Sequence, residues 1–177
     1  MKQISKQLQG PVIDVEATGP SPLGYSMIEI GLVDLHGNEF TCRMRPREGT
    51  SYVAEAMASI GLTWEEVQDW PDPAIQMREF HTFLQDTYGG KRISSWSDNP
   101  GFDWAFINAY LHHYCDNNPL GWSMRRIGDL YAGHVGDSLQ TSKWKSLRDT
   151  KHTHEALDDA RGNAEALGKI LNMMARK

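Results

Sequence analysis

Four carboxylates in this chain lie at the ends of predicted secondary-structure elements, where their side chains can converge on one point. Asp14-x-Glu16 lies in the segment VIDVEATG, which begins as an apolar run. Because residues two apart on a strand face the same side, both carboxylates can reach one ion. Asp103 follows the loop-like residues 97–101, and Asp159 lies about one turn into the last predicted helix, which His154 precedes. Each pattern alone is typical of solvated surface charge, so the joint occurrence indicates the site.

Asp14 is the carboxylate that a surface position explains least well. It interrupts an apolar run that otherwise belongs in a core. An ionised carboxylate buried there without a partner costs several kcal/mol or has its pKa raised. A bound cation removes that cost. Oxygen ligands with little histidine or cysteine nearby favour Mg²⁺ or Mn²⁺ over Zn²⁺. His152 is interpreted as an ordinary loop residue without a role in the site.

The number of carboxylates indicates the reaction. Four carboxylates around one point suit two divalent ions about 3.5–4 Å apart, an arrangement used for in-line attack at phosphorus. One ion lowers the pKa of the attacking water, and the other stabilises the leaving oxygen. His154 can accept the proton from that water, because the ordinary imidazole pKa is about 6.5. These residues therefore indicate metal-dependent cleavage of a phosphodiester.

The elements that must position these residues begin with strands. Apolar and β-branched runs predict a strand over 12–15 and a hairpin of strands over 27–35 and 39–44. A further short strand is predicted over 93–96. Helical patterns follow and alternate with the last strand. The order predicts an α/β domain with a mixed β-sheet flanked by helices.

Helices are predicted from capping signals and apolar periodicity. Residues 51–67 are expected to be helical in pieces, with a break near Gly61-Leu62-Thr63 and a cap at Thr63. Asp72-Pro73 begins the next helix, and two more are predicted over 102–114 and 125–131. Two apolar stripes are expected to face the core. They are Ile75, Phe80, Phe83 and Leu84 on the helix after Asp72, and Leu157, Ala160, Ala164, Leu167, Leu171 and Met174 on the last helix.

Composition limits the class of protein. The chain has 177 residues, with 23 acidic and 18 basic side chains and a formal net charge of -5. We therefore expect one domain over residues 1–177 and exclude a protein that coats nucleic acid through bulk charge. No apolar run approaches the ~20 residues of a membrane span. Cys42 and Cys115 lack paired spacing, which favours a cytoplasmic location.

A basic segment just before His154 is a candidate for holding nucleic acid. Lys143, Lys145 and Arg148 could draw phosphates toward the carboxylates. Trp144 lies among them and could stack on a base, which is worth ~1–3 kcal/mol where it occurs. A solvated loop with Trp144 in the core explains the same pattern equally well.

Three motifs together resemble a known family. VIDVEATG, SDNPGFDWAFIN and HEALDDARGNAEAL resemble the three motifs of the DEDDh 3′–5′ exonucleases, which have an RNase H-like fold. The resemblance spans about residues 12–171 and includes the strand that contains Glu29. The sequence as a whole is similar to the exoribonuclease branch that includes RNase T-like and DexA-like proteins.

The resemblance implies roles for individual residues. It makes the four carboxylates the ligands of two Mg²⁺ or Mn²⁺ ions and His154 the general base. Thr18 falls where the family contacts the terminal nucleotide, and Asn99 and Phe102 match the pattern N-x-x-F-D. Two departures leave every ligand in place. Ala17 stands where many members have threonine, and Asp98 where many have histidine.

The expected activity is release of nucleoside 5′-monophosphates from single-stranded 3′ ends, with RNA favoured over DNA. The resemblance also implies a possible homodimer, while the lack of a long apolar run predicts no membrane partner. A DNA-directed exonuclease of the proofreading type is one alternative, because composition and spacing do not report contacts to the 2′-hydroxyl. A nucleic-acid-binding module without turnover is another, although the chain retains all five motif residues.

Overall fold

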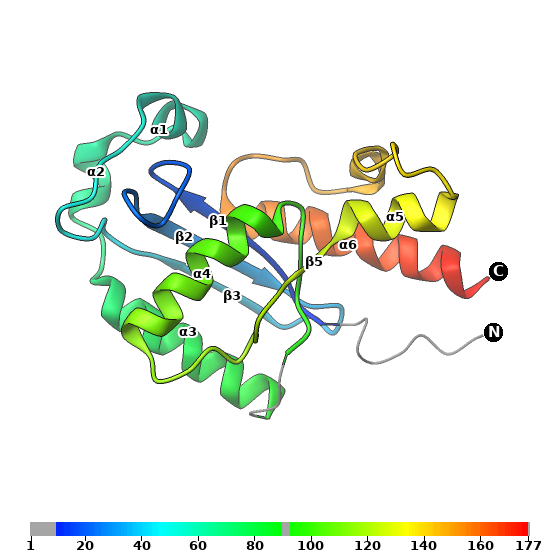
Figure 1. Cartoon of the computed structure of the whole chain (residues 1–177), viewed down its shortest axis with the longest axis horizontal. Coiled ribbons are helices and arrows are strands. Elements are labelled where there is room, and N and C mark those ends of the chain that lie inside the picture. Colours follow the sequence, from blue (N-terminus) through cyan, green and yellow to red (C-terminus); the bar gives the residue numbers. More distant parts are fainter. Residues whose placement is uncertain (1–9, 90–92, 177) are drawn as a thin grey trace.

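The computed structural model describes residues 10–89 and 93–176 and contains a five-stranded mixed sheet flanked by helices (Figure 1). The strand order is β3-β2-β1-β4-β5. The first three strands pair antiparallel, whereas β4 pairs parallel to both β1 and β5. The strands are β1 (Val12–Ala17), β2 (Met27–Val33), β3 (Glu39–Arg43), β4 (Trp96–Ser97) and β5 (Arg125–Arg126). The expected mixed sheet flanked by helices is confirmed.

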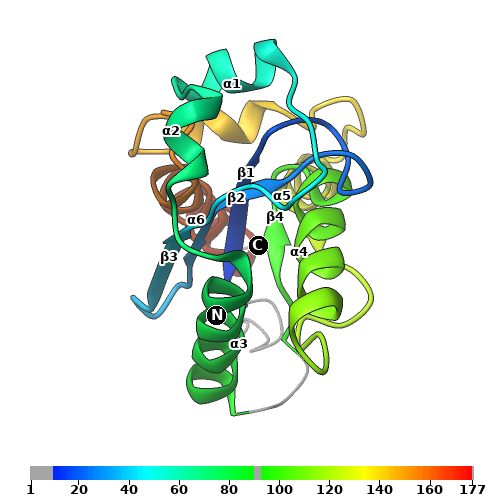
Figure 2. The same cartoon turned by 90° about the vertical axis from the view of Figure 1, so that its left-hand side faces the viewer.

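Helices cover both faces of the sheet and the end toward which β1 runs. Figures 1 and 2 show α1 and α2 beyond that end of β1. The long helices α3 and α4 pack against one face, and α6 packs against the other. The helices are α1 (Ala54–Ile60), α2 (Trp64–Gln68), α3 (Pro73–Tyr88), α4 (Pro100–Tyr114), α5 (Ile127–Val135) and α6 (Ala156–Ala175), with a 3-10 helix at Lys143–Leu147.

Alternation along β1 determines which way its carboxylates point. Ile13 and Val15 belong to the core cluster that contains residues of α3 and α4. Val12 belongs to the cluster on the opposite face, with residues of α6. Since Asp14 and Glu16 share the parity of Val12, their side chains lie on the α6 side of the sheet. The prediction that both carboxylates share one face is therefore confirmed.

Helix starts follow the predicted capping residues. Thr63 caps α2 with a full capping box, in which Glu66 N–H bonds the Thr63 hydroxyl and the Glu66 carboxylate accepts the Thr63 N–H. Gly61 ends α1 at φ 69°, in the left-handed region that glycine tolerates. The Asp72 carboxylate accepts the Ala74 N–H at 2.8 Å at the start of α3. The broken helix and both caps are confirmed.

Two predicted strand and helix boundaries are wrong in position. The strand predicted over 93–96 is limited to Trp96–Ser97, where β4 pairs with β1 and β5. The helix predicted over 125–131 begins at Ile127, because Arg125 and Arg126 form an edge strand beside β4. The pairing partner of these two-residue strands comes from distant sequence, which local periodicity does not report.

The predicted stripe on α3 also needs one correction. Ile75 is 49% exposed, while Met77 is fully buried with Phe80 and Leu84. The buried residues are spaced three and four apart, so they lie on one helical face. Helix α4 begins at Pro100 rather than 102, because proline fits the first turn of a helix.

Two further expectations concern the chain as a whole. Across residues 10–89 and 93–176, no helix combines the length and apolar character that a bilayer crossing requires. Cys42 and Cys115 are both free cysteines.

Candidate active site

The candidate site lies where the end of β1 meets the first turns of α4 and α6 (Figure 1). Asp14 and Glu16 come from β1, and Asp159 comes from the first turn of α6. One carboxylate oxygen from each of these three residues lies within 4.8 Å of the others. Asp159 is 1% exposed, so its carboxylate is almost removed from solvent. This oxygen-only cluster has the donor chemistry that Mg²⁺ or Mn²⁺ requires.

Asp103 lies beside this cluster and is held by the sheet. Its Oδ1 accepts the Val15 N–H at 3.2 Å, and its Oδ2 accepts a hydrogen bond from the Ser97 hydroxyl. The side chain is 3% exposed. These bonds tie the first turn of α4 to β1 and β4, so Asp103 is brought to the same end of the sheet as Asp14.

Burial and mutual repulsion raise the pKa values of these carboxyl groups. The pKa of Asp14 is held well above its ordinary value, mainly by desolvation and secondly by the negative charge of Asp103. Desolvation and the charge of Asp159 raise the pKa of Glu16 to about 8. The pKa of Asp103 rises to about 7, mainly through desolvation. A divalent cation would stabilise the ionised forms, so the residues fit such an ion.

His154 lies at the edge of the cluster in an uncommon backbone conformation. Its φ is 61°, in the left-handed region, which costs about 1 kcal/mol for a residue with a Cβ. Its backbone N–H donates to Asp159 Oδ2 at 3.2 Å. The Nδ1 atom lies 3.9 Å from Glu16 Oε1. The structure thus brings His154 next to the carboxylates, as the sequence predicts.

His152 is a second histidine at this site. Its Nδ1 lies 2.6 Å from Asp159 Oδ2, which is a shorter contact than His154 makes with a carboxylate. The two imidazole rings are tilted with centroids 4.2 Å apart. Interpretation of His152 as loop composition is therefore wrong, and the expectation of little histidine near the carboxylates is corrected.

Glu29 and Gly31 on β2 place the start of α6. Glu29 is 5% exposed, binds Arg43 Nε at 2.7 Å and accepts the Ala156 N–H at 3.4 Å. Gly31 is paired with Asp14 across the sheet. A Cβ on Gly31 would come within 2.1 Å of the Ala156 carbonyl oxygen, so only glycine leaves room for this helix start. The close approach puts Asp159 over Asp14.

Thr18 has a role that differs from the expected nucleotide contact. Its side chain is fully buried at the end of β1. The hydroxyl donates to the Ser51 carbonyl at 2.8 Å and accepts the Ser26 N–H at 2.9 Å. Its hydrogen-bonding capacity is therefore used to fasten the loops that follow β1 and β3, which corrects the expectation that the hydroxyl binds substrate.

Asn99 and Phe102 lie at the start of α4, next to Asp103. Asn99 is exposed at the N-cap position, and within the described part of the chain its side chain does not cap the helix. Phe102 is half-buried, and its ring meets Phe106 edge-on with centroids 5.0 Å apart. Phe102 also packs against the core cluster that contains residues of α3 and α4, so both residues are placed by the start of α4.

Trp144 lies in the core, which resolves the two alternatives for this residue. The ring is fully buried, and its Nε1–H donates to the Thr141 carbonyl at 2.9 Å. The hydrophobic cluster around it contains residues of α6. The prediction that Trp144 stacks on a base is therefore wrong, because no face of the ring is open to a ligand.

The basic segment has only part of its charge directed to solvent. Lys145 Nζ binds Asp98 Oδ2 at 2.5 Å, and Arg148 lies 3.7 Å from the same oxygen. Arg148 also donates to Asn163 Oδ1 at 2.5 Å and covers the Trp144 ring at 4.9 Å. Lys143 is exposed. Asp98 therefore neutralises positive charge that was expected to attract phosphate. The prediction that Arg148 contacts a phosphate directly is wrong in this conformation, because its guanidinium is engaged within the protein.

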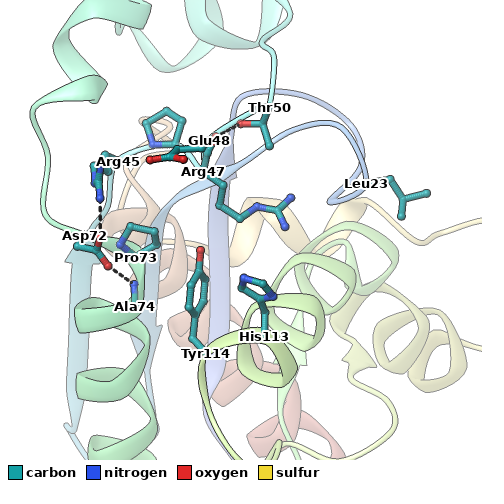
Figure 3. Close-up of a pocket in the computed structure, with 12 residues that line it drawn as sticks. Leu23, Arg45, Arg47, Glu48, Thr50, Asp72, Pro73, Ala74, His113 and Tyr114 are labelled. Atoms are coloured by element: carbon teal, nitrogen blue, oxygen red, sulfur yellow. Dashed lines mark hydrogen bonds and ion pairs between the residues drawn. The ribbon is translucent and has the colours of Figure 1, made fainter.

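A separate pocket of about 520 Å³ lies between the loop after β3, the start of α3 and the end of α4. Figure 3 shows Arg45 bonded to Asp72, and Arg47 reaching toward His113 and Tyr114. Arg47 Nη2 donates to the carbonyls of Pro22 at 2.5 Å and Tyr25 at 3.1 Å. Within the described ranges, none of the candidate-site carboxylates lines this pocket, so it is a different place on the molecule.

Sequence reasoning missed Ser97 and the structural role of Glu29. Glu29 carried a usable signal, because it interrupts an apolar strand as Asp14 does. Ser97 carried none, since a serine before a loop is ordinary composition. Its importance appears only once α4 places Asp103 against β4.

Comparisons with known proteins agree with this arrangement. Residues 10–171 match the model of the Rv2179c-like family, described as a 3′-5′ exoribonuclease Rv2179c-like domain. The chain is 30% identical over 174 residues to the 3′-5′ DNA exonuclease Cap18 of Escherichia coli, covering 93% of this chain and 92% of the relative. It is 25% identical over 178 residues to the PolC-type DNA polymerase III of Thermotoga maritima, covering 93% of this chain but 12% of that protein.

A solved structure shares the fold. The nuclease domain of 3′hExo, described as a DEDDh family member bound to rAMP, superimposes with a TM-score of 0.68 at 18% identity. The match covers 94% of this chain and 91% of that one. The predicted RNase H-like fold is thereby confirmed. The chain is a 3′–5′ exonuclease and belongs to the Rv2179c-like family of 3′-5′ exoribonuclease domains.

Proposed function

We propose that this single-domain enzyme releases nucleoside 5′-monophosphates from single-stranded 3′ ends, with RNA favoured as substrate. The observation that carries the proposal is the convergence of Asp14, Glu16 and Asp159 within 4.8 Å. Asp103 is the fourth member of the set, fixed against β1 at the same end of the sheet. These four carboxylates would hold two Mg²⁺ or Mn²⁺ ions, which lower the pKa of water and stabilise charge on a leaving oxygen.

The remaining steps belong to side chains of the chain itself. His154 is half-exposed beside Glu16, so it can accept a proton from water at the cluster and return it to solvent. Exposed Asn99 and half-buried Phe102 border the entrance from α4 and can contact the terminal nucleotide. Lys143 can attract a backbone phosphate, and Lys145 can do so when it leaves Asp98.

DNA is a specific second candidate for the substrate. The Escherichia coli relative is described as a DNA exonuclease, whereas the family model is described as an exoribonuclease domain. Contacts to the 2′-hydroxyl distinguish the two substrates and depend on local geometry. Digestion rates on matched RNA and DNA oligonucleotides of one sequence test the preference. Faster RNA digestion supports the proposal, and faster DNA digestion replaces it by the alternative.

We also propose that the enzyme forms a homodimer, because many members of the family that it resembles do so. Sedimentation velocity across a range of protein concentrations tests this part separately. A concentration-independent species of monomer mass would contradict it.

A further inference from the structure

A second set of metal-ligating atoms lies beside the carboxylate cluster. Among the described residues, His152, His154 and Asp159 each offer one ligand atom, and these atoms lie within 4.8 Å of one another. Only Asp159 is shared with the oxygen-only set of Asp14 and Glu16. His152 is the residue that creates this second set, because without it the loop would offer a single imidazole.

The loop before α6 holds both imidazoles at one carboxylate. The N–H groups of Thr153 and His154 donate to the two oxygens of Asp159 at 3.0 and 3.2 Å. The left-handed backbone at His154 turns the chain between these bonds and the helix. As a result, the His152 and His154 rings lie 4.2 Å apart, one of them 2.6 Å from Asp159.

Access differs between the members of this set. The side chain of Asp159 is 1% exposed, while those of His152 and His154 are 50% and 42% exposed. An ion can therefore arrive from solvent and meet imidazole nitrogen before it meets the buried carboxylate. Glu16 Oε1 lies 3.9 Å from His154 Nδ1 and can complete a four-coordinate site, as can water.

The two sets differ in the ions that they prefer. Mg²⁺ takes oxygen ligands in octahedral geometry and rarely takes imidazole. Zn²⁺ accepts imidazole nitrogen and carboxylate oxygen in tetrahedral geometry, with three protein ligands and one open position. Two histidines and one carboxylate are therefore a zinc-type donor set next to a magnesium-type set.

We propose that His152, His154 and Asp159 form a Zn²⁺ site that excludes the catalytic cations, because both sets need Asp159. Bound zinc also occupies the imidazole of His154. Zinc is accordingly an inhibitor of this enzyme, and His152 determines its affinity. The exclusion rests on the proposed function, whereas zinc binding itself does not.

The first experiment measures metal affinity without substrate. Zn²⁺ is titrated into chelator-treated protein against a chromophoric chelator, and Mn²⁺ affinity is measured by the paramagnetic resonance signal of the free ion. We expect His152→Ala to weaken zinc binding about tenfold or more, as loss of a ligand does, and to change Mn²⁺ affinity far less. His36→Ala, in an exposed turn between β2 and β3, is the matched control and should change neither.

Two outcomes of this titration overturn the proposal. Equal zinc affinity in wild type and His152→Ala removes His152 from the site. Parallel loss of Zn²⁺ and Mn²⁺ affinity means that His152 only orients Asp159 as an ion pair. Circular dichroism of each variant establishes that it is folded before titration.

The second experiment measures exclusion by exonuclease assay. At fixed Mn²⁺, the zinc concentration for half-inhibition should rise in proportion to Mn²⁺, and His152→Ala should need about tenfold more zinc, matching its binding defect. Inhibition unaffected by Mn²⁺ or by His152→Ala would overturn the exclusion. A wild-type protein that degrades no oligonucleotide in Mn²⁺ would instead contradict the proposed function, while the affinity difference still decides the zinc site.

Discussion

Asp14 is the residue for which we expect catalytic use and thermodynamic cost to conflict. Its pKa is held well above the ordinary value by desolvation and by the charge of Asp103. A carboxylate in such surroundings destabilises the cation-free fold when it ionises. Activity and stability should therefore respond in opposite directions when its charge is removed.

The isosteric substitution Asp14→Asn tests this opposition. We expect turnover to fall by about a thousandfold or more, since a metal ligand supplies several kcal/mol of charge stabilisation. We also expect the melting temperature in chelator at pH 8 to rise, because a repelling charge is gone. Thermal unfolding and a single-turnover assay measure the two effects. Retained turnover, or a lower melting temperature, would contradict the assignment.

A test of His154 requires a residue that can adopt its left-handed backbone conformation. Asparagine tolerates the left-handed region better than most residues, so His154→Asn removes the imidazole with little added strain. We expect kcat near neutral pH to fall by about 10²–10⁴-fold, the usual contribution of a general base. Mn²⁺ affinity should be preserved, because the carboxylates remain. A kcat equal to that of wild type would exclude His154 as the base.

At the element scale, the decisive contact is between β2 and the start of α6. Gly31 pairs with Asp14 and lies against the backbone of Ala156 and Leu157. Glu29 binds the first N–H of the same helix. The distance between Asp14 and Asp159 therefore depends on a strand that supplies neither carboxylate.

Gly31→Ala tests this dependence. Its Cβ would meet backbone atoms that must shift, so we expect destabilisation of about 1–3 kcal/mol together with loss of activity. Gly133→Ala is the matched control, because a Cβ there meets nothing within 4 Å. In α5 it should stabilise by about 0.5–1 kcal/mol and leave turnover unchanged. Denaturant titration reports stability, and equal behaviour of the two variants would contradict the packing account.

Elements that depend on local signals are predictable from the sequence, and those that depend on distant partners are not. The strand with Asp14, the cap at Thr63 and the face of α6 follow from periodicity and capping chemistry. The two-residue strands β4 and β5 exist only because they pair with each other and β4 pairs with β1. The burial of Trp144 and the contact of His152 with Asp159 likewise depend on α6, so neither could be predicted from local sequence.

At the scale of the whole molecule, the carboxylate cluster makes stability depend on pH. Glu16 and Asp103 have pKa values raised to about 8 and about 7 in the folded protein. In the unfolded chain these groups ionise near pH 4–4.5. Between these limits the folded state binds more protons, so the free energy of unfolding falls as pH rises.

Without divalent cations, we expect the free energy of unfolding to fall by on the order of a few kcal/mol between pH 5 and pH 8. Saturating Mg²⁺ should flatten this dependence, because bound cations stabilise the ionised carboxylates. Asp34 does not contribute between pH 5 and pH 8. Partial burial raises its pKa, but hydrogen bonds from Asn38 and neighbouring groups lower it overall, so Asp34 affects stability only at lower pH. Chemical denaturation at each pH, with chelator or Mg²⁺, measures the slopes. A flat profile in chelator would contradict the account.

We expect the carboxylate cluster to remove nucleotides from a 3′ end only when divalent cations are bound. One assay tests it directly. A 5′-labelled single strand, as RNA and as DNA, is incubated with wild type and Asp14→Asn in Mn²⁺ or chelator. We predict a ladder shortened from the 3′ end, with nucleoside monophosphates released, only for wild type in Mn²⁺. Intact strands with wild type, or equal ladders from Asp14→Asn, would contradict the claim.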